Sequence, residues 1–406
     1  MRVFFIHPNF PAQFRHLAAA LGRDEKNEVF FLTANRRPEW EIPGVRKVVY
    51  PGSDFSGLGR REFVRAAVRH AELAAQSLAE VGRKAGAPDV LYAHSGWGAG
   101  LLVRDVFPKS ILFGYFEWYY DSSGENARFD GGKKLNLGRV FDYRCRNMVI
   151  DQDLLHCHAG IVPTRWQKSQ FPKSFQPKLK CLHDGVDISF FCPGEAQNTF
   201  SDAIGESEEI ITYCARGLEP ARGFPQFMRA AALVLRDRPK ACAIVVGSDR
   251  TPYGEKPRQH RSFREQMLAE LGAEAERIHF TGPLPYGKYR DILRLSNVHV
   301  YLTRPFVLSW SCLEAMSCAC LVVGSNTPPV REVLKDGGNG LLAEFSEPED
   351  ISAKINTALD YPSFMDSLRK KARQTILENY SLEKLLPVHL EMVQKAVSGK
   401  SNGPFG

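Results

Sequence analysis

The sequence contains no long hydrophobic run. No stretch of its 406 residues approaches the ~18 apolar residues that a membrane-spanning helix needs. The N-terminal run MRVFFI stops at His7-Pro8, short of the ~7–15 residues that form the apolar core of a secretory signal. We therefore interpret residues 2–6 as a first buried strand and expect a cytoplasmic protein.

The sequence also lacks a paired-cysteine pattern. Its nine cysteines are scattered and show no CxxC spacing, which is typical of small buried side chains in a reducing compartment. His156-Cys-His158 has no second ligand pair at a spacing that suits zinc. Disulfides are therefore not expected, and the sequence implies neither a metal site nor a cofactor.

Internal repeats and low-complexity tracts are absent as well, and a chain of this length predicts two or three domains. The net charge of +7 is uneven, because residues 1–200 hold 27 basic and 21 acidic residues while the remainder holds 26 and 25. A basic first half indicates an anionic partner, such as phosphate groups, an acidic glycan or an anionic membrane surface, or else a merely solvated surface. No nucleic-acid-binding module accompanies the basic residues, so nucleic acid is not an expected partner.

Short apolar runs alternate with amphipathic helical patterns along the chain, which predicts an α/β fold built from βαβ units and parallel sheets. A long basic helix over about 60–85 repeats its apolar residues at three- and four-residue spacing, so one face should pack on a sheet. In the first half we predict strands at 2–6, 28–33, 89–93, 111–116 and 160–163. In the second half we predict strands at 209–215, 241–247, 277–280, 298–303 and 320–324, and helices at 225–236, 262–271, 287–294, 309–318, 349–359 and 381–397.

The turn-rich stretch 181–200 interrupts this alternation and predicts an interdomain linker. We expect an N-terminal domain over 1–190 and a C-terminal domain over 191–370. The last segment, 371–406, should form a helix that packs back on the N-domain and then a flexible tail. Two Rossmann-like, doubly wound domains facing each other across a cleft are the simplest assembly, with ligands at the carboxyl ends of strands, next to helix N-termini.

One carboxylate stands inside an otherwise apolar run, RPFVLSWSCLEAM, at 304–316. A buried carboxylate is costly without a partner, so Glu314 predicts a binding role. Ser309 is a candidate N-cap, and the loop amides with the helix N-terminus form an anion site. Glu314 follows about one turn later, where it could accept two hydrogen bonds from a vicinal diol. A phosphate with a ribose diol nearby describes a nucleotide.

A second loop carries two arginines. The strand at 209–215 leads into ARGLEPARGF, which places Arg216 and Arg222 between a strand and a helix. Guanidinium forks match phosphate oxygens, so the pair could clamp a pyrophosphate. A surface ion pair is the alternative for each arginine taken alone.

Together these segments resemble family 4 retaining glycosyltransferases, which have the GT-B fold. The segment 216–224 is similar to the family's strand–Gly-Arg-Leu–Lys-Gly pattern, with Arg222 in place of the lysine, and Leu313-Glu314-Ala-Met matches its Leu-Glu-Ala-Met helix. Residues 183–194 resemble the family's Asn-Gly-Val-Asp hinge, 161–172 its Pro-Thr-x-Trp helix start, and 328–342 its glycine-containing tail. The resemblance covers nearly the whole chain.

The resemblance implies an enzyme of the retaining hexosyltransferase type. It would move a sugar from a nucleotide-sugar donor, UDP-linked as the first expectation and GDP-linked as the second, to an acceptor hydroxyl without a metal. Arg216 and Arg222 would hold the diphosphate, and Glu314 the ribose hydroxyls. The other implied donor contacts are backbone groups: Leu308 and Ser309 at phosphate and sugar, and Gly282 and Leu284 beside the base.

The family pattern E-x7-E is incomplete in this chain. Its second glutamate is Glu314, but the position of the first is occupied by Phe306. In the family the first glutamate contacts the donor sugar, so Glu314 lacks that partner. We interpret this as a branch with altered sugar contacts. The alternative is loss of catalysis, which would leave a non-catalytic nucleotide-sugar-binding subunit.

The residues that act on the donor sugar are then expected in the N-domain. His94 lies at the carboxyl end of a predicted strand, where the family has a histidine that approaches the donor sugar; a capped structural histidine is the alternative. Because no nucleophile pair is visible, we expect a front-face route in which the two arginines stabilise charge on the leaving diphosphate.

Acceptor contacts are expected from variable N-domain loops. A basic N-domain suits a glycan, lipid-linked or small-molecule acceptor that is phosphorylated or acidic, and also suits a peripheral contact with the anionic inner face of a membrane. The candidate acceptor residues are Asn9, Glu117, Tyr119 and Asp121.

Three other interpretations of the sequence point to different chemistry. Asp151-Gln-Asp153 is a literal DxD, which holds a metal-bound nucleotide in other glycosyltransferases, but it lies in a helical stretch. The glycines of HSGWGAG (94–100) lack the GxGxxG spacing of a dehydrogenase. A sugar-nucleotide epimerase of the same fold remains an alternative, although the Leu-Glu-Ala-Met segment and the two-arginine loop speak against it.

Overall fold

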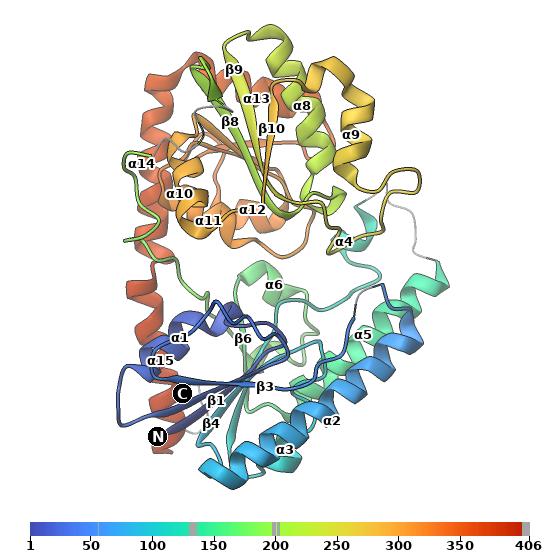
Figure 1. The fold of residues 1–406 in the computed structure, drawn as a ribbon, viewed down its shortest axis with the longest axis vertical. Helices are drawn as coiled ribbons and strands as arrows, with labels where there is room; N and C mark the ends of the chain where they lie inside the picture. The colour runs from blue at the N-terminus through green and yellow to red at the C-terminus, as the bar shows by residue number, and fades with distance from the viewer. Residues whose placement is uncertain (56, 130–135, 197–199, 201–203, 400–406) are drawn as a thin grey trace. The chain divides into compact units, whose positions relative to one another are not determined.

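The computed structural model describes residues 1–55, 57–129, 136–196, 200 and 204–399. The chain forms two compact units (Figure 1). Unit 1 contains residues 1–185 and the described part of the segment that begins at Glu383, and unit 2 contains residues 186–382. The flexible tail expected at the end of the chain falls on 400–406, outside the described residues, as do 197–199 of the expected linker.

Unit 1 is built on a seven-stranded parallel sheet in the order β3-β2-β1-β4-β5-β6-β7. Successive residues of a strand point to opposite faces, so Phe4 and Ile6 enter one core while Val3 and Phe5 enter the other. Apolar residues on both faces of β1 are what a fully covered parallel sheet requires. The strands are β1 (Arg2–Ile6), β2 (Glu28–Thr33), β3 (Val45–Val49), β4 (Val90–His94), β5 (Ile111–Tyr115), β6 (Ala159–Val162) and β7 (Leu179–Cys181).

Helices cover both faces of this sheet. Leu17 and Leu21 of α1 share one core with Met392 and Val393 of α15, so the last helix of the chain packs in unit 1 (Figure 1). The long helix α2 and α5 supply the opposite core. The helices are α1 (Arg15–Gly22), α2 (Arg60–Ala85), α3 (Val103–Val106), α4 (Glu125–Arg128), α5 (Leu137–His156), α6 (Arg165–Ser169) and α15 (Leu382–Ser398).

Unit 2 repeats the plan with six parallel strands in the order β10-β9-β8-β11-β12-β13. The strands are β8 (Glu209–Gly217), β9 (Ala241–Ser248), β10 (Ile278–Gly282), β11 (Val298–Tyr301), β12 (Val322–Ser325) and β13 (Leu341–Ala343). The helices are α8 (Phe224–Asp237), α9 (Phe263–Leu271), α10 (Tyr286–Leu295), α11 (Trp310–Ser317), α12 (Pro328–Val333), α13 (Pro348–Asp360) and α14 (Pro362–Asn379).

The predicted α/β class with two doubly wound parallel sheets is confirmed, and each predicted strand and helix is present within a few residues. Two kinds of element were not predicted. Strands β3, β7 and β13 are short edge or near-edge strands, and β3 is only partly buried, so none contains a long apolar run. Helix α14 buries just Met365, Leu368, Ala372 and Ile376 of its 18 residues. Among the described helices, none is long and apolar enough to span a bilayer.

The strand orders determine where each unit can bind a ligand. In unit 1, β1 lies between β2 and β4, and in unit 2, β8 lies between β9 and β11. After β2 and β3, or after β9 and β10, the chain returns to the other side of the first strand. Such a reversal opens a crevice beyond the carboxyl ends of the two diverging strands. The relevant loops therefore follow β1 and β4 in unit 1, and β8 and β11 in unit 2.

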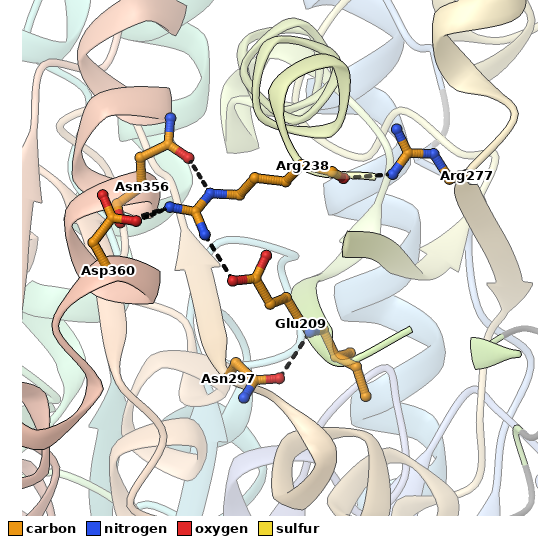
Figure 2. Close-up of polar contacts among 7 residues, drawn as sticks. Glu209, Arg238, Arg277, Asn297, Asn356 and Asp360 are labelled. Carbon is orange, nitrogen blue, oxygen red and sulfur yellow. Dashed lines mark hydrogen bonds and ion pairs between the residues drawn. The ribbon is translucent and has the colours of Figure 1, made fainter. Parts of the chain in front are cut away.

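The opposite, amino-terminal edge of the unit 2 sheet is fastened by Arg238 at the end of α8 (Figure 2). Its guanidinium donates to Glu209 Oε1 over 2.7 Å, to Asn356 Oδ1 over 2.7 Å and to the carboxylate of Asp360. Arg277 in turn donates to the carbonyl oxygens of Arg238 and Ala241 over 2.7 Å each. These contacts join α8, α13 and the start of β8, and they lie away from the carboxyl ends.

We expect Arg238→Ala to lower the stability of unit 2 by about 2–3 kcal/mol, because it removes charge-assisted hydrogen bonds and leaves Glu209 without its cation. Urea unfolding of wild type and variant measures the loss. Arg236→Ala is the matched control, since Arg236 is exposed and pairs with exposed Asp237, and it should change stability by no more than about 0.5 kcal/mol. Equal effects of the two substitutions would contradict the role given to Arg238.

Candidate functional site

His94 is the last residue of β4 and lies at the reversal point of unit 1. Its ring is buried and stacks on Tyr115, with ring centroids 5.5 Å apart. Nδ1 lies 2.9 Å from the carbonyl oxygen of Ser95. A carbonyl can only accept a hydrogen bond, so Nδ1 is the nitrogen that carries the proton in the neutral ring. Nε2 is then the basic nitrogen, and it lies 3.5 Å from Oε2 of Glu117.

Glu117 follows β5 and connects His94 to the surface. Its side chain is 38% exposed, while its Oε1 accepts a hydrogen bond from Gln13 Nε2 over 2.8 Å. The ring of His7, the first residue after β1, lies 4.4 Å from the ring of His94. Loops that follow β1, β4 and β5 thus bring an imidazole pair and one half-exposed carboxylate together. Such a group can accept, hold or release a proton.

Helix α5 holds two of these loops in place. Asp153 Oδ2 accepts hydrogen bonds from Ser95 Oγ over 2.7 Å and from the backbone N–H of Gly96 over 3.4 Å. Asp151, two residues earlier on the same helix, holds the loop after β5, because its Oδ1 accepts a hydrogen bond from the hydroxyl of Tyr119 over 3.0 Å. The two aspartates of the DxD pattern are therefore loop anchors on a helix, in keeping with the helical placement predicted from the sequence.

Asp153 is the more constrained of the two aspartates. It is buried, and its Oδ1 has no hydrogen-bond partner among the described residues. A Cβ at Gly100 would lie 2.6 Å from that oxygen, so the glycine-rich turn of HSGWGAG serves close packing against a carboxylate. Burial raises the pKa of Asp153 from 3.8 to about 6, against the lowering effect of its bonds to Ser95 and Gly96.

The remaining predicted acceptor residues lie on the same side of the unit 1 sheet. Asn9 is exposed on the loop after β1, and its backbone N–H donates to His7 Nδ1 over 2.8 Å. Asp121 is exposed after β5 and accepts from Ser123 Oγ within its own turn. The fold thus gives Asn9, Glu117, Tyr119 and Asp121 a common edge, formed by the carboxyl ends of β1 and β5.

In unit 2, Arg222 is buried and fixed in place. Its Nη1 donates to Thr303 Oγ1 over 2.8 Å and to the carbonyl oxygen of Val307 over 2.9 Å, so the β8 loop is tied to the β11 loop across the reversal point. The following Gly223 has φ +66°, and a Cβ there would lie 2.5 Å from Leu302 Cβ. Only glycine fits this conformation and spacing, which explains the Arg-Gly pair of the motif.

Arg216 differs from Arg222 in its surroundings. Its side chain is exposed, and its carbonyl oxygen accepts a hydrogen bond from Ser248 Oγ over 2.8 Å. The structure therefore places one fixed guanidinium, that of Arg222, on the loop after β8, and one exposed guanidinium, that of Arg216, at the end of β8 itself, where the sequence had predicted a loop. A fixed cation can position a phosphate, and an exposed one can fold onto it.

Glu219, between these arginines in sequence, was not singled out in the sequence analysis. Its exposed fraction is 0%, and its Oε2 accepts the backbone N–H of Tyr253 over 2.9 Å. Burial raises the pKa of Glu219 to about 7, while the Tyr253 hydrogen bond and the charges of Arg222 and Arg216 act in the opposite direction. The segment ARGLEPARGF does place an acidic residue between two arginines, but the phosphate-binding interpretation rests on the arginines alone.

Phe306, the residue at the first position of E-x7-E, packs against the loop that Glu219 anchors. Its ring centroid is 5.2 Å from that of Tyr253, and the guanidinium carbon of Arg222 lies 5.3 Å from the same Tyr253 ring. An aromatic pair with a cation over one face therefore occupies this position. The role of Phe306 in sugar contact stays a prediction.

Helix α11 carries the other predicted donor residues. Ser309 caps the helix through its side chain, as predicted, and its backbone N–H donates to the hydroxyl of Tyr301 over 2.7 Å. That amide is already engaged, so a phosphate would compete with Tyr301 for it. Leu308 is buried beside it.

Glu314 is buried on α11 and faces β8 and α10. Burial and then its negative charge raise the pKa of Cys214 on β8 and of Tyr289 on α10 above their ordinary ranges. The carboxylate thus lies near the reversal point between β8 and β11, as the sequence predicted for a ligand-binding residue. Gly282 ends β10 with φ +70°, and Leu284 follows it beside the β8–β9 core.

We expect Asp153→Asn to abolish a pH dependence of stability. Between about pH 4 and pH 6 the folded protein keeps the Asp153 proton while the unfolded chain releases it, so this group costs stability as the pH rises through that window. The variant should therefore gain on the order of 2 kcal/mol relative to wild type between pH 4.5 and pH 7. Denaturant unfolding at both pH values measures the difference. Asp142→Asn, on the exposed side of α5, should show no such gain.

Comparison with known proteins relates both halves of this sequence to glycosyl transferase families. Residues 25–191 match the family model of the glycosyl transferase family 4 group, and residues 195–375 match that of the glycosyl transferases group 1. D-inositol 3-phosphate glycosyltransferase 1 of Catenulispora acidiphila is 24% identical over 295 residues. The match covers 72% of this chain and 63%, less than two thirds, of that relative's length.

Two solved structures show the same fold. Sucrose-phosphate synthase from Thermosynechococcus elongatus has a TM-score of 0.76 at 15% identity, covering 98% of this chain and 100% of that one. Alr3699/HepE of Anabaena in complex with UDP-glucose has a TM-score of 0.72 at 15% identity, again with 98% and 100% coverage. The predicted GT-B fold is thereby confirmed. Each family model spans most of one unit: the model of the glycosyl transferase family 4 group matches most of unit 1, and that of the glycosyl transferases group 1 matches most of unit 2.

Proposed function

We propose that this protein is a retaining glycosyltransferase that moves a hexosyl group from a nucleotide-sugar donor to an acceptor hydroxyl without a metal. The observation that carries the proposal is the set of residues at the unit 2 reversal point: exposed Arg216 at the end of β8, buried Arg222 on the loop that follows it, and buried Glu314 on α11 after β11. Two cations and one carboxylate at such a point suit a diphosphate joined to a ribose. The structure of a UDP-glucose complex with the same fold supports a UDP-linked donor as the first choice, and a GDP-linked donor is the second choice from the family resemblance.

Each donor residue has a distinct role in this proposal. Arg222, held by Thr303 and Val307, positions the diphosphate without having to reorganise during the reaction. Arg216 is free to close onto the outer phosphate oxygens. Glu314 accepts hydrogen bonds from the ribose hydroxyls. The backbone at Leu308 and Ser309 contacts phosphate and sugar, and the backbone at Gly282 and Leu284 flanks the base.

Unit 1 supplies the chemistry at the sugar. His94 offers Nε2 as a hydrogen-bond acceptor toward a sugar or acceptor hydroxyl, because Nδ1 is committed to Ser95. We assign retention to a front-face route, in which the leaving diphosphate takes part in removing the acceptor proton. Arg216 and Arg222 stabilise the charge that develops on that diphosphate.

The acceptor side is proposed from unit 1 as well. Asn9, Glu117, Tyr119 and Asp121 surround the His94 end of the sheet, and the basic excess of the first half suits a phosphorylated, acidic or membrane-linked acceptor. Binding to acidic glycans and to anionic vesicles at two salt concentrations distinguishes these sources.

A non-catalytic nucleotide-sugar-binding subunit is the second candidate, and one observation favours it. Phe306 stands where the E-x7-E pattern has its first glutamate, and its ring contacts Tyr253. The pattern is therefore left with a single glutamate. Such a protein would bind the donor and release no sugar to any acceptor.

The donor proposal is tested by thermal denaturation with UDP, GDP, ADP and their sugar conjugates. A ligand at about 100 times its Kd should stabilise the wild type by about 2.7 kcal/mol. Glu314→Gln should abolish or strongly reduce this gain for one base, because the neutral amide accepts the ribose hydroxyls less well. Glu276→Gln, at an exposed site of unit 2, is the control and should keep the full gain. If none of the nucleotides stabilises the wild type, the proposal fails.

The catalytic proposal is tested with His94→Gln and the donor identified above. Release of nucleoside diphosphate by slow transfer to water should fall about a hundredfold or more, while donor binding measured by thermal denaturation should remain. His156→Gln, an exposed histidine on α5, should leave the rate unchanged. An unaltered rate in His94→Gln would remove this residue from the chemistry, and a wild type without any transfer would favour the non-catalytic subunit.

A further inference from the structure

Glu219 is a buried carboxylate whose hydrogen bonding is only half complete. Its exposed fraction is 0%, and one oxygen, Oε2, accepts the backbone N–H of Tyr253 over 2.9 Å. The other oxygen, Oε1, is buried and has no hydrogen-bond partner among the described residues. A buried carboxylate oxygen without a donor is costly, and the cost is relieved if the group takes a proton or if a ligand brings a donor.

The charged and titratable groups that face Glu219 come from β8, from its own loop and from the loop after β9. Arg216 and Tyr213 belong to β8, Arg222 is the cation of the loop, and Tyr253 is the titratable residue of the loop after β9. Arg222 directs Nη1 to Thr303 and Val307 instead of to Glu219, and both arginines act on Glu219 through their charge. The carboxylate therefore shares the field of the two cations without a direct bond to them.

The charge balance of this loop changes when a diphosphate arrives. Two guanidinium groups and an ionised Glu219 sum to one positive charge, whereas a nucleotide-sugar pyrophosphate brings two negative charges. An ionised carboxylate buried beside that pyrophosphate would be repelled by it, and the low-dielectric surroundings would screen the repulsion poorly. A neutral carboxylic acid would restore the balance, and its O–H could donate a hydrogen bond to a phosphate or sugar oxygen.

We propose that Glu219 takes up one proton from solvent when the pyrophosphate of a nucleotide sugar binds beside Arg216 and Arg222, so that donor affinity is linked to pH through this carboxylate. The inference rests on the proposed donor site of unit 2 and adds to it a residue and a proton. No bond other than the O–H of the acid forms, and none breaks. The free protein is already poised for this exchange, because burial raises the pKa of Glu219 to about 7.

The test is isothermal titration calorimetry with UDP-glucose at pH 7.5 in two buffers of different ionisation enthalpy. The pyrophosphate diester of this probe stays doubly charged between pH 6 and pH 8, so its own ionisation contributes no proton. We expect the wild type to take up roughly half to one proton per bound donor, and its Kd to rise about tenfold from pH 6 to pH 8.

Glu219→Gln is the decisive variant. Glutamine can keep the hydrogen bond from the Tyr253 N–H, but it cannot titrate, so proton uptake should vanish and Kd should become independent of pH. Glu208→Gln removes an exposed carboxylate of unit 2 that pairs with Lys240, and it should behave like the wild type. If Glu219→Gln does not fold, the buffer dependence of the wild type alone still decides whether a proton is taken up.

The outcomes separate this inference from the proposed function. If UDP-glucose binds with the same Kd at all pH values and without proton uptake, the inference is overturned and the donor site stands. If proton uptake persists in Glu219→Gln, another group is responsible and the inference is likewise overturned. If neither UDP-glucose nor any other nucleotide sugar binds the wild type, the proposed function fails, and the inference fails with it.

Discussion

Parallel strand pairing is the constraint on which the rest of this structure depends. All strands of a parallel sheet end at the same edge, and each sheet here reverses its order at its first strand. The chain therefore delivers loops from distant parts of the sequence to one point in each unit. Segments 217–223 and 302–309 meet in this way, and the bonds from Arg222 to Thr303 and Val307 are the direct consequence. The opposite edge of the unit 2 sheet carries stabilising contacts, such as the hydrogen bond from Arg238 to Glu209 (Figure 2).

Buried and partly buried polar groups divide into two kinds in this fold. Buried Arg222 and partly buried Arg238 and Arg277 are matched by carboxylates, carbonyl oxygens or a hydroxyl, so they stabilise the positions of helices and loops. Asp153 and Glu219 each keep one buried oxygen without a hydrogen-bond partner among the described residues. Glu219 lies on the loop after β8 and Asp153 on α5 beside the loop after β4, and burial raises the pKa of both. An incomplete hydrogen-bond set costs stability at rest, and at Glu219 a proton or a ligand would complete it.

The sequence was sufficient for the fold because hydrophobic periodicity reports the strands and helices that fill the two cores. It was insufficient where burial is partial: no residue of β3 is fully buried, and the few buried residues of α14 are spread among charged ones. At the candidate site, residue types at strand ends led to His94, Arg222 and Glu314. The partners of these residues could not be predicted, because Ser95, Thr303 and Tyr253 are brought to them by loop conformations that no local pattern encodes. Glu219 was visible in the motif, but its burial was not.

If Phe306 replaces a carboxylate of the family pattern, as we propose, the change affects the charge of the neighbouring loops. A second glutamate beside Arg222 would lower the net positive charge of the β8 and β11 loops, and this chain already has Glu219 there. Phe306 packs edge-to-face on Tyr253, whose backbone N–H donates to Glu219, and that carboxylate is fully buried in a low-dielectric setting. Such a setting favours the protonated form. The absence of a carboxylate at Phe306 and the protonation of Glu219 would then act together. A proton on Glu219, and not the sequence alone, would set the net charge that meets a diphosphate.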